Sequence, residues 1–192
     1  MIQLIPMERR PPNTTGLAIM LYVNTPEMGN SFYQTYLEPF GFPRTRYPNA
    51  PFYTDYHITL GYLEAVHFDD VQKLSDHLSS DLSNNINLNQ VFFKFGMPTL
   101  LGLPRKPFIA ILPENTDNFC NYNQIVFESL KSFKNGTYTL DTHTLPNYYL
   151  PHINLYGQVN KHIESKSVNT VLMSLRQKLQ GITLPFSKIK IR

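Results

Sequence analysis

Apolar residues in the first half of the chain follow strand spacing and helix spacing in turn. Gly16 to Val23 is an apolar run of strand length, and apolar residues from Met28 to Phe40 recur at helical intervals. Tyr56 to Leu63 predicts a second strand, and Phe68 to Leu82 predicts an amphipathic helix. The pattern therefore predicts the order strand, helix, strand, helix.

The second half repeats this order. The strand-length runs Val91 to Phe95 and Phe108 to Leu112 predict a hairpin, and Phe119 to Phe133 predicts a helix. Tyr148 to Tyr156 predicts the next strand, and Val168 to Leu179 predicts the last helix. Ser187 to Arg192 alternates strictly, which predicts a final half-buried strand. Its three cations share one face of that strand: Lys188, Lys190 and Arg192.

A short motif occurs in the second main strand of each half. Tyr56-His57-Ile58-Thr59-Leu60 in the first half corresponds to Pro151-His152-Ile153-Asn154-Leu155 in the second. Alternate side chains of a strand point the same way, so His57 and Thr59 share a face, as do His152 and Asn154. An internal repeat with a histidine at the same place in each half is the most informative feature of the sequence.

Two imidazoles that face each other suit general acid–base chemistry near neutral pH. One would take a proton from a nucleophile and the other would give one to a leaving group. The Thr59 hydroxyl and the Asn154 amide would each donate a hydrogen bond to an oxyanion between them. The pattern points to a phosphoryl centre, although either histidine alone would more often be a half-buried polar residue.

Composition narrows the classes of protein. The 192 residues are 42% hydrophobic and 16% charged, which is too apolar for a disordered chain. The single cysteine, Cys120, excludes an internal disulfide framework and a multi-cysteine zinc site. The longest apolar run, Leu17 to Val23, is too short for a membrane helix, and the first residues do not resemble a signal peptide. The net charge of +3 is compatible with a polyanionic ligand.

The residues that carry these motifs resemble a known family. Tyr56 to Leu63 resembles the first signature of the two-histidine phosphoesterase superfamily, which includes the RNA ligase/cyclic phosphodiesterase-like proteins. Pro151 to Leu155 resembles the second signature, and Leu103 to Ala110 resembles the basic, proline-containing segment that leads into a central strand. The resemblance implies an α+β fold with two pseudo-symmetric lobes in one domain over residues 1–192. In that fold two antiparallel sheets surround a central cleft.

The resemblance also implies metal-independent hydrolysis of RNA-type phosphodiesters, such as 2′,3′-cyclic phosphates or 2′,5′-linked oligonucleotides. His57 and His152 would be the catalytic acid–base pair, and Thr59 would contact phosphate. We expect RNA or a small nucleotide as the partner, with no cofactor, no metal and no membrane. We also expect a cytoplasmic monomer.

Two positions depart from the family pattern. Asn154 stands where the family has Thr or Ser, and Gly61 stands where a basic residue often follows the first motif. An amide still donates hydrogen bonds, so binding of the substrate can survive at Asn154.

Two other classes of protein stay open. One is a non-catalytic RNA- or nucleotide-binding module with a degenerate second motif. The other is a metal enzyme that uses Asp55, His57 and His152 as ligands.

Other residues offer weaker candidates. Tyr156 lies two residues beyond Asn154, so it either stacks on a base or is a partly exposed strand tyrosine. Arg105, beside Lys106 at a loop tip, either meets a phosphate or is solvated. Asp55 either orients His57 or is a surface carboxylate. Further cations extend a basic surface or serve only solubility: Arg44, Arg46, Lys188, Lys190 and Arg192.

A third stretch matches the spacing of the two signatures but cannot form such a site. His77-Leu78-Ser79 matches the spacing of the two signatures, but it lies in the predicted helix from Phe68 to Leu82. Helix residues two apart point to different sides, so His77 and Ser79 cannot serve one phosphate. The remaining histidines, which lack the motif, are expected at the surface or in loops: His67, His143 and His162.

Overall fold

The computed structural model describes residues 11–23, 26–36, 38–40, 56–102, 107–134, 136–156 and 165–192. Strands and helices are mixed along this part of the chain. The strands are β1 (Thr14–Val23), β2 (His57–His67), β3 (Phe92–Leu101), β4 (Phe108–Pro113), β5 (Tyr138–Leu140), β6 (Ile153–Tyr156) and β7 (Thr183–Ile191). The α-helices are α1 (Pro26–Tyr36), α2 (Phe68–Asn85), α3 (Asp117–Ser132) and α4 (Ser165–Leu179). Short 3₁₀ segments are η1 (Glu38–Phe40), η2 (Leu88–Gln90) and η3 (Thr142–Thr144).

The strands form a single antiparallel sheet in the order β1-β7-β3-β4-β6-β2-β5. β1 also pairs with β2, so every described strand except β5 belongs to a closed, barrel-like ring. β7 pairs with β1 through its second half and with β3 through its first half, and it thereby joins the two halves of the chain. The expected division into two lobes with separate sheets is therefore not confirmed.

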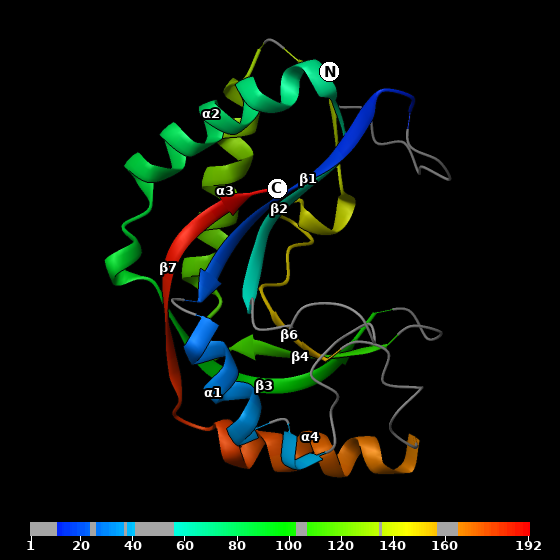
Figure 1. The fold of residues 1–192 in the computed structure, drawn as a ribbon, viewed down its shortest axis with the longest axis vertical. Coiled ribbons are helices and arrows are strands. Elements are labelled where there is room, and N and C mark those ends of the chain that lie inside the picture. The colour runs from blue at the N-terminus through cyan, green and yellow to red at the C-terminus, as the bar shows by residue number, and fades with distance from the viewer. Residues whose placement is uncertain are drawn as a thin grey trace.

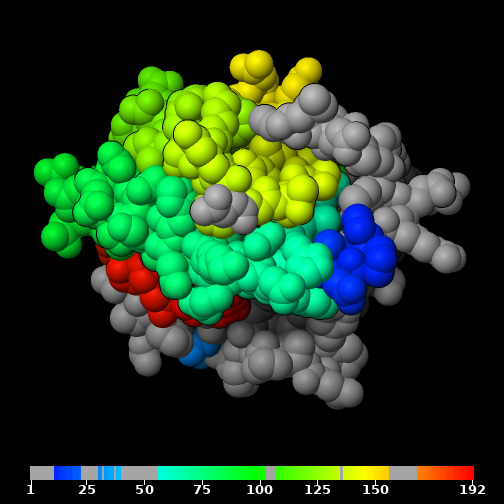
Figure 2. Space-filling view, turned by 90° about the horizontal axis from the view of Figure 1, so that it is seen from above, coloured from blue at the N-terminus to red at the C-terminus, as the bar shows by residue number. Residues whose placement is uncertain are grey.

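The helices cover the outside of the ring. α2 and α3 pack on each other and against β2 at one end, whereas α4 packs on β3 at the other end with α1 beside it (Figure 1). Seen from above, α2 and α3 together cover their end of the molecule (Figure 2). No helix in the described ranges is both long enough and apolar enough to cross a membrane.

The apolar stripe of α2 shows why the helical spacing was a reliable guide. Leu74, Leu78 and Leu82 are fully buried and belong to the core between the helices and the sheet. His67, expected at the surface, is half-exposed and caps α2, because its Nδ1 accepts a hydrogen bond from the Asp69 amide at 3.4 Å. The predicted helix from Phe68 to Leu82 is thus confirmed, with three more residues at its C-terminal end.

One predicted strand is shorter than expected, and one strand was not predicted. The strand expected from Tyr148 to Tyr156 begins only at Ile153, because the preceding residues turn: the Tyr148 amide donates to the Leu145 carbonyl at 2.8 Å. The short strand Tyr138–Leu140, which pairs with β2, was not predicted. A strand of three residues is too short to show a period of two.

Candidate functional site

The two histidine motifs lie side by side. β2 and β6 are antiparallel neighbours, and Ile58 pairs with Ile153. Both isoleucines are fully buried in the core. Because side chains alternate along a strand, the residues on either side of each isoleucine project from the opposite face of the sheet. We call this the histidine face, and it carries the four motif residues His57, Thr59, His152 and Asn154.

The register decides which motif residues oppose each other. With Ile58 opposite Ile153, antiparallel pairing sets His57 opposite Asn154 and Thr59 opposite His152. The two histidines are then diagonal neighbours, which lie about 7–8 Å apart across an antiparallel pair. A backbone separation of this size is compatible with a phosphoryl group between the two side chains, with one hydrogen-bonding side chain beside each.

The environment of His152 favours a neutral imidazole with a defined tautomer. Its Nδ1 lies 2.8 Å from the carbonyl of Leu150, and a carbonyl only accepts, so Nδ1 carries the hydrogen. The ring of Phe108 stacks on the imidazole with centroids 5.8 Å apart. Burial lowers the pKa of His152, and the hydrogen bond to Leu150 offsets part of this effect. Nε2 is therefore left as a proton acceptor, as a general base requires.

His57 is held by a different aromatic ring. Tyr22 on β1 pairs with His57, and the two rings stack with centroids 5.2 Å apart. Tyr22 is buried, and two cations lie over its ring: Nζ of Lys190 in β7 at 4.5 Å from the centroid, and Cζ of Arg192, the residue after β7, at 5.3 Å. Each histidine thus packs against one aromatic ring from a neighbouring strand.

A β-bulge lies at the end of the first motif. Ile19 pairs with Gly61 and Met20 pairs with Thr59, so two residues of β1 span three residues of β2 and Leu60 is the extra one. Alternation along β2 changes phase here, because Leu60 and Gly61 are both buried. Bulges are common beside functional sites, where they re-aim a side chain. This bulge ends the run of β2 residues that alternate in phase with His57.

Two side chains hold the carbonyl groups at the bulge. The buried Asn123 of α3 donates through Nδ2 to the carbonyl of Leu60 at 2.6 Å and to that of Thr144 at 2.8 Å. Tyr149 donates its hydroxyl to the carbonyl of Thr59 at 3.0 Å. Burial raises the pKa of Tyr149, so its hydroxyl stays protonated and keeps donating. The backbone of the first motif is therefore fixed from two elements.

The bulge also explains the glycine at position 61. A Cβ atom on Gly61 would lie 2.9 Å from Cγ1 of Val126 on α3, a residue of the core. Position 61 thus points to the helix side of the sheet and not to the histidine face. The departure from the family pattern at Gly61 therefore has a structural reason, because a basic side chain at this position would not reach the motif residues.

Asn154 lies on the histidine face, on the strand between β2 and β4. It pairs with the fully buried Ala110 of β4. Asn154 Oδ1 is buried and has no hydrogen-bond partner among the described residues. A buried polar atom without a hydrogen-bond partner lowers the stability of the fold. A hydrogen bond of Oδ1 within the described residues therefore does not explain why an asparagine stands at position 154.

Several predicted candidates lie outside the described residues. These are Arg105, Lys106, Asp55, Arg44, Arg46 and His162, together with the side chain of Tyr156. The metal alternative needs Asp55 and is not tested. Within the described ranges there is no group of three or more His, Cys, Asp or Glu residues that could hold a metal ion.

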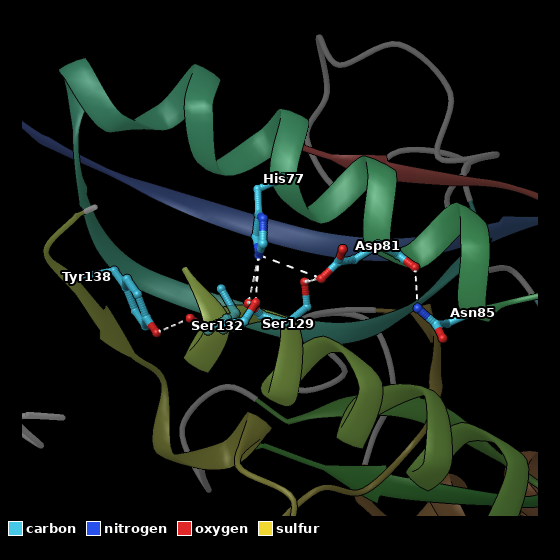
Figure 3. Close-up of polar contacts among 7 residues, drawn as sticks. His77, Asp81, Asn85, Ser129, Ser132 and Tyr138 are labelled. Carbon is cyan, nitrogen blue, oxygen red and sulfur yellow. Dashed lines mark hydrogen bonds and ion pairs between the residues drawn. The ribbon is translucent and has the colours of Figure 1, made fainter. Parts of the chain in front are cut away.

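His77, which the sequence analysis excluded from the site, contacts residues of both α2 and α3. His77 Nε2 lies 2.9 Å from the carbonyl of Ser129 and 3.0 Å from Oγ of Ser132, so His77 connects α2 with α3 (Figure 3). The same nitrogen lies 3.7 Å from Oδ2 of Asp81, which is also on α2. All three contacts go to one ring nitrogen. A catalytic triad needs the acid and the nucleophile on different nitrogens, so this cluster cannot relay a proton in that way.

The sequence did not single out four residues that support the site. Tyr22 and Phe108 sit within apolar strands, where nothing distinguishes a core ring from a ring that packs on a histidine. Tyr149 follows another tyrosine and shows no period. Asn123 does leave a signal, because it is a polar residue four positions after Phe119 on the apolar stripe of a helix.

No protein-family model and no curated protein matches the sequence. Among solved structures, Usb1 of Kluyveromyces marxianus is similar in fold, with a TM-score of 0.56 at 12% identity over 95% of each chain. A second structure of the same protein, with uridine monophosphate, has a TM-score of 0.47 at 8% identity, over 92% of this chain and 94% of that one. The first likeness shows a shared fold.

Proposed function

We propose that the protein is a metal-independent phosphodiesterase that acts on RNA-type phosphodiesters by acid–base catalysis with His57 and His152. The observation that carries this proposal is the register of β2 and β6, which places both motifs on one face of adjacent strands. The fold likeness to Usb1 supports the overall fold in which this register is found.

The environments of the two histidines suggest their roles. His152 is the base, because its hydrogen bond to Leu150 leaves Nε2 free to accept a proton and its pKa is lowered. His57 is the acid. In hydrolysis of a 2′,3′-cyclic phosphate, a water oxygen forms the new bond to phosphorus while the bond from phosphorus to one ribose oxygen breaks. The water proton passes to His152, and His57 gives a proton to the leaving oxygen.

Hydrogen-bond donors beside the histidines stabilise the charge that develops on the phosphoryl oxygens. Thr59 donates from β2 and Asn154 donates from β6. Tyr156 and Arg105 are further substrate contacts in this proposal, as a base-stacking ring and a phosphate-binding cation. The departure at Asn154, an amide where the family has Thr or Ser, favours the alternative of a binding module with a degenerate second motif that binds a nucleotide without turnover.

A substrate panel tests the proposal. Turnover is measured in EDTA on 2′,3′-cyclic mononucleotides and on 2′,5′- and 3′,5′-linked oligonucleotides, with the product isomer identified. We expect turnover of at least one of them in EDTA. Turnover that EDTA abolishes would instead indicate the metal enzyme, and nucleotide binding without any turnover would indicate the binding module.

Variants then test the acid–base pair. His57→Ala and His152→Ala should each lower turnover by roughly 10²–10⁴-fold, the usual effect of losing a general acid or base. The double variant should be little worse than either single variant, because the two groups act as a unit. His143→Ala, which removes an exposed histidine from η3, is the matched control and should keep full turnover. Single variants with wild-type rates would overturn the mechanism.

A further inference from the structure

One tyrosine ties the segment that leads into the second motif to the backbone of the first motif. Tyr149, three residues before His152, donates its hydroxyl to the carbonyl of Thr59 at 3.0 Å. Among the described residues a single residue pair, Ile58 with Ile153, joins β2 to β6. The hydrogen bond from Tyr149 therefore adds a further connection between the motifs, and it reaches the residue that follows Ile58 on β2.

The residue directly after Tyr149 sets the tautomer of His152. His152 Nδ1 lies 2.8 Å from the Leu150 carbonyl, so Nδ1 carries the hydrogen and Nε2 is left to accept a proton. Pro151 stands between the two residues, and its ring restricts Leu150 to extended backbone. The position of the Leu150 carbonyl is thus limited by Pro151 on one side and by Tyr149 on the other.

Tyr149 is the residue that holds this segment in place. Its neighbours Tyr148 and Leu150 are exposed, at 72% and 42%, whereas Tyr149 packs against the core. Burial, and to a smaller extent the neighbouring Cys120, raise the pKa of the Tyr149 hydroxyl. The hydroxyl therefore stays protonated, and it donates to Thr59 throughout the pH range in which a histidine titrates.

The described strands next to His152 bring no carboxylate to its ring. β4 and β6 contain no aspartate or glutamate, and the one acidic residue of β2, Glu64, lies beyond the bulge. The titratable group that the register sets diagonally across from His152 is His57. The Leu150 carbonyl is thus the acceptor that decides which nitrogen of His152 carries the hydrogen.

We propose that Tyr149 is a positioning residue for His152: its hydrogen bond to Thr59 holds the Leu150 carbonyl where it keeps the hydrogen of His152 on Nδ1. The backbone of the first motif would then fix the tautomer of the base in the second motif. This inference rests on the proposed function, in which Nε2 of His152 takes the proton of the attacking water. Without the Tyr149 hydroxyl, a tautomer with the hydrogen on Nε2 becomes populated, and that tautomer cannot accept the proton.

Tyr149→Phe tests the proposal, because it removes the hydroxyl and keeps the ring. The matched control is Tyr138→Phe. Tyr138 also donates its hydroxyl to a backbone carbonyl, that of Leu130 at 2.6 Å, and it pairs with Val66 at the other end of β2 from His57 (Figure 3). Urea unfolding checks that both variants are folded under the assay conditions.

Two measurements are made on each protein. The first is the ¹⁵N NMR spectrum of the neutral His152 ring, which distinguishes a ring nitrogen that carries hydrogen from one that does not. The signals of His152 are those that His152→Ala lacks. The second is kcat and KM on the best substrate of the panel.

In the wild type and in Tyr138→Phe, the neutral His152 ring should carry its hydrogen on Nδ1. In Tyr149→Phe its two nitrogen signals should move toward each other, because the two tautomers exchange. The kcat of Tyr149→Phe should fall by roughly 10–100-fold, the range found for groups that orient metal-binding histidines. KM should stay close to the wild-type value, because the hydroxyl acts on the base and not on bound substrate.

An unchanged His152 spectrum in Tyr149→Phe would overturn the positioning role, and so would equal kcat values of the two tyrosine variants in an active enzyme. The proposed function fails by a different result. If the wild type turns over no phosphodiester and the His152 signals still move in Tyr149→Phe but not in Tyr138→Phe, the catalytic proposal fails and the anchoring of His152 stands. If the wild type is active and both tyrosine variants match it, the positioning role fails and the catalytic proposal stands.

Discussion

The amide of Asn123 on α3 donates a hydrogen bond of 2.6 Å to the backbone carbonyl of Leu60, the extra residue of the bulge in β2. The same amide also reaches the carbonyl of Thr144. Asn123 therefore connects a helix, the bulge at the end of the first motif and the segment that follows β5. It is one of the few polar side chains that the described part of the chain buries completely.

Asn123→Leu should lower the free energy of unfolding by about 1–3 kcal/mol, because a leucine of similar size leaves the carbonyls of Leu60 and Thr144 without their donor. Urea unfolding measures the change. Gln124→Ala, at the exposed neighbouring position, is the control and should stay within about 0.5 kcal/mol of wild type. If both variants unfold at the same urea concentration, the bulge does not depend on Asn123.

His152 should titrate below its ordinary pKa of about 6.5, because burial disfavours the imidazolium. If His152 is the base, the acid limb of the rate profile should lie below pH 6.5. The basic limb should follow loss of the proton on His57, which makes the profile bell-shaped. Titration of the His152 ring followed by NMR, beside the rate profile, checks both statements. A His152 ring that titrates at or above 6.5 would contradict them.

The same lowered pKa affects stability. Between the folded pKa of His152 and about 6.5, the unfolded chain binds more protons than the folded one, so stability is full above 6.5 and falls as pH decreases through this window. His152→Asn should lose less stability than wild type between pH 7.5 and pH 5. The comparison uses urea unfolding at both pH values, and an equal loss in both proteins would show that His152 does not contribute.

Two variants of Asn154 distinguish a functional role of this residue from a structural one. Asn154→Thr should keep or raise activity, because a hydroxyl also donates to a phosphoryl oxygen. Asn154→Leu should lower turnover by roughly 10²–10³-fold, the effect of losing one oxyanion donor. It should not lower stability, because Oδ1 of Asn154 has no partner to lose within the described structure. Equal turnover in wild type and both variants would remove Asn154 from the site.

Gly61→Lys should not restore the basic residue that the family often has after the first motif. The new Cβ would lie 2.9 Å from Val126 Cγ1 in the core, so we expect a loss of about 1–3 kcal/mol in the free energy of unfolding. Gly61→Ala, measured in parallel, should show most of this loss, because the clash is with Cβ itself. A stable Gly61→Lys variant with tighter phosphate binding would show that position 61 does face the motif.

His77→Ala should destabilise the contact between α2 and α3 and leave turnover per folded molecule unchanged. The variant removes the ring nitrogen that contacts Ser129, Ser132 and Asp81, at a cost of about 1–3 kcal/mol. Thermal unfolding and an assay well below the transition measure the two effects. A loss of turnover comparable to that of His152→Ala would contradict the structural reading of His77.

Local periodicity was enough to predict most of the described elements. The apolar stripe Leu74, Leu78 and Leu82 predicted α2, because helical spacing brings these residues to one buried face whatever they pack against. Likewise, the alternation around Ile58 and Ile153 was enough to separate the core side of each motif from its polar side. Both conclusions depend only on the geometry of a single element.

Tertiary structure alone decided how the two motifs meet. The pairing of Ile58 with Ile153 joins residues far apart in sequence, and a slip of one residue would have turned one motif away from the other. The same holds for the ring that packs on each histidine, since Tyr22 and Phe108 come from other strands. Strand pairing, bulges and ring contacts depend on which strands become neighbours. A local sequence pattern does not show which strands become neighbours. The sequence therefore predicted which residues carry the chemistry of the site, but not the strand pairing, the bulge and the rings that hold them.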